Sequence, residues 1–195
     1  MSVKHTNRKG KTFHLHQGFT SKGNPKYYFS SKKSGDLVEE IPAGYEIHEK
    51  PDTAQVFLRK TRSSRITDDE REMTLCEARK AAGTDHILVE VDGDSLVIHF
   101  AERNDRLTNE LYGDLGLSQA KFEQLTRSFE RKYLDYQKVL RFTLADESKR
   151  MFSVERWCFK GSIDDWFPLE FASPLAEIVP KYCQHLGKES FFELM

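Results

Sequence analysis

Two apolar runs flank an Asp-Gly pair in the stretch HILVEVDGDSLVIHF, residues 86–100. Asp-Gly is among the strongest short signals for a β-hairpin, because a type I′ turn needs a positive φ at both of its central positions. With these two residues at the centre of the turn, Val89 lies opposite Leu96 and His86 lies opposite His99. The stretch therefore predicts two antiparallel strands joined by a tight turn.

Helical patterns lie on both sides of this hairpin. Thr67-Asp68-Asp69-Glu70 matches the capping box, in which the Thr hydroxyl and the Glu carboxylate bond to N–H groups at a helix start. We expect this helix to end at Gly83, because glycine readily adopts the left-handed conformation. A longer helix is predicted to begin at Ser118, since apolar residues then recur at spacings of three and four. These residues are Phe122, Leu125, Phe129, Tyr133, Tyr136 and Leu140.

The other segments predict mainly strands. Strands are expected at residues 12–17, 26–31, 41–48 and 55–60 in the N-terminal third, and at 139–144 and 150–160 after the longest helix. A last helical stretch is expected to begin at Ser173-Pro174, and Pro180 is expected to break or kink it. This order predicts an α+β fold: a small N-terminal antiparallel sheet, followed by hairpins and helices packed on an antiparallel sheet.

The composition is that of a soluble globular protein. Of the 195 residues, 38% are hydrophobic and 12% are aromatic, which is enough apolar surface to build a core. The apolar runs are far shorter than a membrane-spanning helix requires, and no apolar stretch follows the basic N-terminus as in a secretory signal. The three cysteines are widely spaced and odd in number, which is poor material for a disulfide framework. We therefore expect a cytoplasmic protein with reduced thiols.

Charge is distributed unevenly along the chain, although the net charge is only −1. Residues 1–66 contain 13 Lys and Arg against six Asp and Glu, so the remainder is acidic. We predict a basic β-rich N-terminal module at 1–66 and an acidic α+β domain at 67–195, and leave open whether the two form one continuous domain. Such opposed halves indicate either a basic surface for a polyanion or two parts that attract each other.

The basic N-terminal sheet is the first candidate site. Nucleic-acid surfaces need cations that neutralise phosphates and flat rings on which bases stack. The predicted polyanion-binding residues are Lys11, Lys22, Lys26, Tyr28, Lys32, Lys33 and Arg59. In a strand, Tyr27 and Phe29 face one side and Tyr28 the other, so one of these two sets is expected to be core. The alternative is a solvated sheet face that docks on the acidic remainder or on another acidic protein surface.

A second candidate site lies in the run from Glu155 to Trp166. Two adjacent carboxylates stand there near two cations and two indole rings, as in a ligand pocket or an acid–base pair. The residues of this candidate pocket are Arg156, Lys160, Asp164 and Asp165. The alternative is structural: Ser162 or Asp164 caps a short helical turn while the tryptophans pack inside. An enzyme or a small-ligand-binding protein is thus the alternative function, and a structural subunit of a protein complex is a third.

Metal and nucleophile patterns are weak. His14 and His16 share one face of a strand, and His86 and His99 pair across the predicted hairpin, but neither set has Cys or carboxylate neighbours at a recurring spacing. The sequence contains no Gly-rich phosphate loop, no Gly-x-Ser-x-Gly elbow and no His-Glu-x-x-His helix. We therefore predict no metal, no cofactor and no catalytic residue, and a non-enzymatic role is favoured.

Several strings resemble an uncharacterised bacterial protein family. They are HLHQG (14–18), GNPKYYFS (23–30), IPAGYEI (41–47), QVFLR (55–59), GSIDDW (161–166) and SFFEL (190–194). The resemblance covers about the first third of the chain and the last fifth. It implies a bacterial cytoplasmic protein of unknown function, and no catalytic residue is carried over from it.

Overall fold

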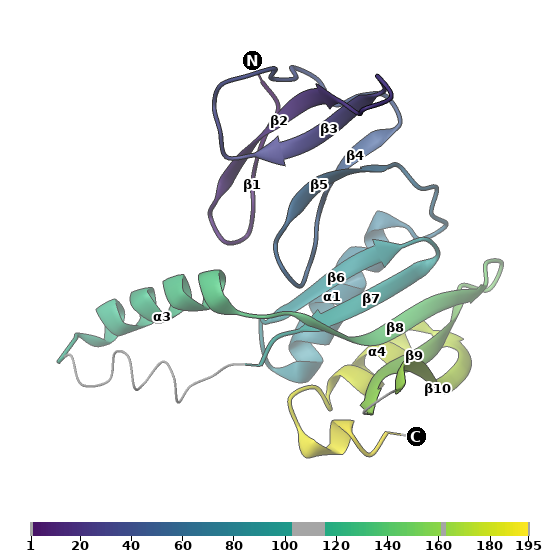
Figure 1. Ribbon diagram of the computed structural model, residues 1–195. Helices are drawn as coiled ribbons and strands as arrows, with labels where there is room; N and C mark the ends of the chain where they lie inside the picture. Colours follow the sequence, from purple (N-terminus) through teal and green to yellow (C-terminus); the bar gives the residue numbers. More distant parts are fainter. Residues whose placement is uncertain (1, 103–115, 161–162, 195) are drawn as a thin grey trace. The chain divides into compact units, whose positions relative to one another are not determined.

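The computed structural model describes residues 2–102, 116–160 and 163–194 (Figure 1). Contacts divide the chain into two compact units. The first comprises Met1–Thr61 with Arg103–Leu134, and the second comprises Arg62–Glu102 with Asp135–Met195. All sheets in the described residues are antiparallel, and helices accompany them, so the predicted α+β class is confirmed.

The first unit contains two small sheets. One has the order β1-β2-β3, with β1 at Lys4–Thr6, β2 at Thr12–Phe19 and β3 at Pro25–Ser30. The other is a hairpin of β4 (Tyr45–Glu49) and β5 (Val56–Lys60). The buried apolar side chains of this unit include Leu15, Ala54 and Val56. This unit also contains helix α3 (Gln119–Tyr133).

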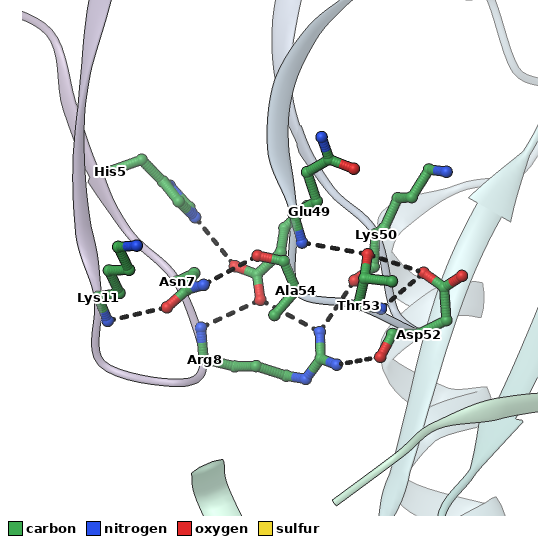
Figure 2. A network of polar contacts seen from close by, with 10 residues as sticks. His5, Asn7, Arg8, Lys11, Glu49, Lys50, Asp52, Thr53 and Ala54 are labelled. Carbon is green, nitrogen blue, oxygen red and sulfur yellow. Dashed lines mark hydrogen bonds and ion pairs between the residues drawn. The ribbon is translucent and has the colours of Figure 1, made fainter. Parts of the chain in front are cut away.

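A polar network connects the β1–β2 turn to the end of the β4–β5 hairpin (Figure 2). The Glu49 carboxylate accepts hydrogen bonds from the Arg8 backbone N–H at 3.0 Å and from Arg8 Nη1 at 3.4 Å, and it lies 3.1 Å from His5 Nε2. Asn7 is buried, and its Nδ2 donates to the Ala54 carbonyl at 2.8 Å. Few apolar side chains are buried among the described residues of this unit, so these polar bonds contribute to fixing the relative position of its two hairpins.

The second unit is a five-stranded sheet with two helices on one face. The strand order is β10-β9-β8-β7-β6. The strands are β6 (Ile87–Asp92), β7 (Ser95–Phe100), β8 (Gln137–Asp146), β9 (Met151–Lys160) and β10 (Ile163–Pro174). Helices α1 (Asp68–Ala82) and α4 (Leu175–Cys183) contact each other, and the short 3-10 helix η2 (Glu189–Phe191) follows. The core cluster joins side chains of both helices to one face of the sheet, including Ala78, Ile178, Leu140, Phe142 and Val154.

Helix α1 has the ends that its sequence predicts. The Thr67 side chain accepts from the Glu70 backbone N–H, and the Glu70 carboxylate accepts from the Thr67 backbone N–H. Gly83 ends the helix with φ 69°, in the left-handed region that favours glycine. Both end signals are local, which is why the sequence specifies them correctly.

The predicted hairpin forms, but its register differs by two residues from the prediction. Asp92 pairs with Ser95, so Gly93 and Asp94 are the central residues, and only Gly93 has a positive φ. This pattern fits a type II′ turn, which needs a positive φ only at its first central position. Consequently Leu88, and not His86, lies opposite His99. A shift of two residues leaves every side chain on its predicted face.

The helix that begins after Ser118 ends earlier than its apolar spacing predicts. Helix α3 stops at Tyr133, and Leu140 instead lies fully buried in β8. Along β8, residues alternate between buried and more exposed positions, which is the two-residue period of a strand with one face on a core. The spacing of three and four between apolar residues therefore continues by coincidence from the helix into this strand.

The region around residues 161–174 also differs from the prediction. Asp164 and Asp165 lie in strand β10 and not in a short helical turn, while Ser162 lies outside the described residues. Two register shifts interrupt the pairing of β10 with β9, between Pro168 and Glu170 and between Glu170 and Ser173. Helix α4 continues through Pro180, so the predicted break does not occur there.

The segment 62–66 belongs to the second unit by its contacts. Arg62 Nη1 lies 2.8 Å from Asp92 Oδ1, and Arg65 Nε lies 3.0 Å from Asp94 Oδ2, so both arginines bind the β6–β7 hairpin. Ser64 Oγ donates to the Gly93 carbonyl at 2.6 Å. The boundary between the units thus follows Thr61, and the predicted modules 1–66 and 67–195 stay a prediction.

Within the described part of the chain, no helix has the combination of length and hydropathy needed to cross a membrane.

Candidate polyanion-binding surface

Four predicted lysines belong to the β2–β3 hairpin and the segment that follows it. Lys22 lies in the turn between the strands, Lys26 lies in β3, and Lys32 and Lys33 follow the end of β3. All four are exposed. Among the residues that the structure describes, no carboxylate forms an ion pair with any of them. Their charges are therefore available to an external anion.

Tyr28 lies on the same hairpin and rests on His16. The register of β2 and β3 places these two residues opposite each other, and their rings stack with centroids 5.3 Å apart and planes 12° apart. His16 is buried at 3% exposure, whereas Tyr28 keeps 45% of its surface exposed. The hairpin therefore presents an aromatic ring that is supported on one side and accessible to solvent.

The support under Tyr28 is fixed by backbone contacts. His16 Nε2 donates to the Lys32 carbonyl at 3.1 Å, because a carbonyl oxygen only accepts. Glycine at position 35 brings the backbone close to the imidazole: a Cβ added to Gly35 would lie 3.7 Å from His16 Nδ1. At Gly18, an added Cβ would lie 3.5 Å from the Tyr28 ring. The hydrogen bond to the Lys32 carbonyl thus holds the imidazole, and the backbone at Gly18 and Gly35 lies close to the ring pair.

The opposite side of β3 faces inward, as strand alternation predicts. Tyr27 and Phe29 are half-buried, and the Tyr27 ring lies 6.2 Å from the ring of Tyr45 in β4. Tyr28 alone of these three aromatic residues is classed as exposed. The two faces of β3 therefore differ in exposure, with Tyr27 and Phe29 half-buried and Tyr28 exposed.

The structure does not bring all the predicted cations to this surface. Arg59 Nε donates to Glu46 Oε1 at 2.6 Å across the β4–β5 hairpin, which compensates its charge. The Lys11 ammonium lies 5.3 Å from the centroid of the Phe13 ring, beside the β1–β2 turn and at the other end of β2 from Lys22. We define the hairpin surface as Lys22, Lys26, Tyr28, Lys32 and Lys33.

The residues of the second candidate site do not all share one face of the sheet, because Asp165 lies on the face of Arg156 and Asp164 on the other. Asp164 and Asp165 are consecutive in β10 and so face opposite sides. Asp165 Oδ1 accepts from the Trp166 backbone N–H at 2.8 Å, and Arg156 is buried on the side that packs against the helices. Lys160 ends β9, and its side chain lies outside the described part. The two carboxylates therefore do not form a close acid–base pair.

Sequence reasoning missed two cations beside the tryptophans. Trp157 and Trp166 pair across β9 and β10 with ring centroids 5.1 Å apart. Lys138 Nζ lies 3.3 Å from the Trp157 centroid, and Arg141 lies 4.4 Å from the Trp166 centroid. The sequence carries no signal for these contacts, because they depend on the order of the strands in the sheet.

Cys183 ends helix α4, and His185 follows it closely. Cys183 is fully buried, and its desolvation raises the pKa of the thiol to about 12, so it is not a thiolate near neutral pH. His185 Nδ1 lies 2.9 Å from Ser190 Oγ. Among the described residues, no group of three or more His, Cys, Asp or Glu could hold a metal ion.

The chain was compared with known families, proteins and structures. No family model, curated protein or solved structure matches it. The resemblance to an uncharacterised bacterial family stays a prediction, and the function rests on the geometry above.

Proposed function

We propose that this protein binds single-stranded nucleic acid through the hairpin surface. The observation that carries the proposal is the Tyr28 ring, stacked on buried His16 and exposed on the same hairpin as unpaired lysines. A single strand offers bases for stacking as well as phosphates, whereas the bases of a duplex are already stacked on one another. This combination favours a single strand over a purely electrostatic partner.

The lysines supply the electrostatic part of the binding. Each lysine that neutralises a phosphate releases condensed counterions, which makes affinity depend on salt. The hairpin surface has four lysines without ion pairs among the described residues, so they need not break a salt bridge before binding. Tyr28 then adds a contact that depends on bases and not on charge.

Binding of a fluorescent oligo(dT) of about 20 nucleotides tests the proposal. We expect the logarithm of affinity to fall linearly with the logarithm of salt, with a slope of about −3 if four lysines each contact a phosphate. The measurement is fluorescence anisotropy over about 50–300 mM NaCl. An affinity that does not change with salt, or no binding at the lowest salt, would contradict the proposal.

Substitutions of Tyr28 distinguish the contribution of base stacking to binding from that of charge. Tyr28→Leu removes the ring but no charge, and we expect a loss of oligo(dT) affinity of roughly 5- to 100-fold, since stacking on an aromatic side chain contributes about 1–3 kcal/mol per base. Tyr28→Phe keeps the ring and should bind like the unchanged protein. Inorganic polyphosphate, which has no bases, should bind both variants equally. If Tyr28→Leu binds oligo(dT) as tightly as Tyr28→Phe does, the surface recognises charge alone and the partner is another polyanion.

A further inference from the structure

Arg156 is a buried cation in the second unit, far along the sequence from the hairpin surface. It lies in β9 opposite Leu140 of β8, on the sheet face that carries Phe152 and Val154 into the core. Its exposed fraction is 9%. A guanidinium stays protonated in proteins, so Arg156 cannot relieve burial by losing its charge.

The partners of Arg156 within the chain are few. Nη1 donates to the Phe191 carbonyl at 3.5 Å, at the outer limit for a hydrogen bond, and the guanidinium lies 5.9 Å from the Phe191 ring centroid. Nε is buried and has no hydrogen-bond partner. In the described ranges 2–102, 116–160 and 163–194, no carboxylate lies within ion-pair distance of it. Asp165 faces the same side of the sheet from β10, yet it forms no ion pair with Arg156.

An anion bound to the Arg156 guanidinium would offset the cost of burying its charge. Burying an unpaired charge costs far more than one long hydrogen bond to a neutral carbonyl returns. The neighbouring strand offers an apolar surface beside the guanidinium, because Phe167 lies directly opposite Arg156 and is 43% exposed. Phe192 packs edge-on against Phe191 with centroids 5.7 Å apart, and it is 71% exposed. The ring nearest the guanidinium, Phe191, is buried, while Phe167 on the paired strand and Phe192 beside Phe191 are exposed.

We propose that Arg156 binds the oxyanion of a small aromatic acid, a carboxylate or a phosphate monoester, and that the aromatic part of the ligand packs on Phe167. The planar guanidinium suits the paired oxygens of either group, since two parallel N–H···O bonds form at once. This site lies in the second unit and is independent of the hairpin surface.

Ligand-dependent thermal stability tests this assignment, with benzoate and phenyl phosphate as probes and benzamide as a neutral control. A ligand that binds only the folded state raises Tm. We expect at least one anionic probe to raise Tm by about 3–6 °C at ten times its Kd, and benzamide to raise it by less than about 1 °C. The probe that raises Tm shows whether the site binds a carboxylate or a phosphate monoester. No rise with either anion, or an equal rise with benzamide, would overturn the proposal.

Two arginine variants make the test specific. Arg156→Met should abolish the rise in Tm with the active probe, and without ligand its Tm should equal or exceed that of the unchanged protein, because an unpaired buried charge is removed. Arg141→Met is the control: Arg141 lies in adjacent β8 and already forms an ion pair with Glu155 at 2.6 Å. It should keep the response.

Other outcomes of these variants count against the site. If Arg156→Met retains the response, or Arg141→Met loses it to the same extent, the anion binds elsewhere. If Arg156→Met fails to fold, Arg156 is needed for folding even without ligand. The proposal is then wrong, unless Arg156→Lys folds and can be tested in its place. Arg156→Lys keeps the charge but loses the planar fork, so its affinity for the active probe should fall at least about tenfold. An unchanged affinity in this variant would overturn the proposal.

Discussion

Replacing Lys22, Lys26, Lys32 and Lys33 together by alanine will weaken oligo(dT) binding by two to three orders of magnitude at about 0.1 M salt. Each phosphate contact with a single strand contributes about 0.7 to the slope of log affinity against log salt, so losing four contacts removes about 3 from that slope. The four side chains are exposed and unpaired within the described residues, so the free energy of unfolding should change by less than about 1 kcal/mol. Anisotropy titrations and urea denaturation measure the two quantities.

A matched variant separates the hairpin surface from net charge. Four other lysines are also exposed: Lys80, Lys121, Lys149 and Lys188. Replacing all four by alanine removes the same number of positive charges. We expect this variant to lose less than about tenfold in oligo(dT) affinity and to keep most of its salt slope. If both quadruple variants weaken binding equally, general charge and not the β2–β3 hairpin attracts the nucleic acid, and the proposed surface is wrong.

Asn7→Ala will lower the free energy of unfolding by about 2–4 kcal/mol. The Asn7 side chain donates to the Ala54 carbonyl at 2.8 Å and accepts from the Lys11 backbone N–H at 2.9 Å (Figure 2). Since Asn7 is buried, its removal leaves both backbone groups without a partner and leaves a cavity. The effect is large because Asn7 is a buried polar side chain in the network that joins the two hairpins of the first unit.

Thr6→Ala is the control for this prediction. Thr6 Oγ1 lies 2.9 Å from Thr12 Oγ1, but this contact is exposed, so water replaces it at little cost. We expect a loss below about 0.5 kcal/mol in urea denaturation. Equal effects of the two substitutions would show that Asn7 does not hold the hairpins together. A loss of only a few tenths of a kcal/mol in Asn7→Ala would lead to the same conclusion.

The parts of the fold that sequence predicts are those with local causes. The capping box at Thr67 and the left-handed Gly83 each depend on residues within one helical turn, and both are confirmed. Leu140 shows the opposite case, because its spacing fits the apolar stripe of the preceding helix and also the alternation of β8. Only tertiary contacts choose between these two periods, and burial in the core cluster chooses the strand.

In the candidate sites, too, sequence predicts the features with local causes and not those that depend on strand pairing. The exposed lysines and Tyr28 could be predicted from composition and strand alternation, but the stack of Tyr28 on His16 depends on the register of β2 and β3. Arg59 was predicted to contact phosphate, yet cross-strand pairing places Glu46 beside it. Adjacency in sequence also misled the prediction at Asp164 and Asp165, because consecutive strand residues point apart.

The two register shifts in β10 affect how molecules of this protein meet one another. An outer strand normally offers a ladder of unused main-chain donors and acceptors, on which a strand of another molecule can assemble. In β10 the shifts at Pro168, Glu170 and Ser173 interrupt that ladder, and proline has no N–H to offer. The sheet therefore resists edge-to-edge aggregation along this stretch, although Phe171 on the same strand is 79% exposed.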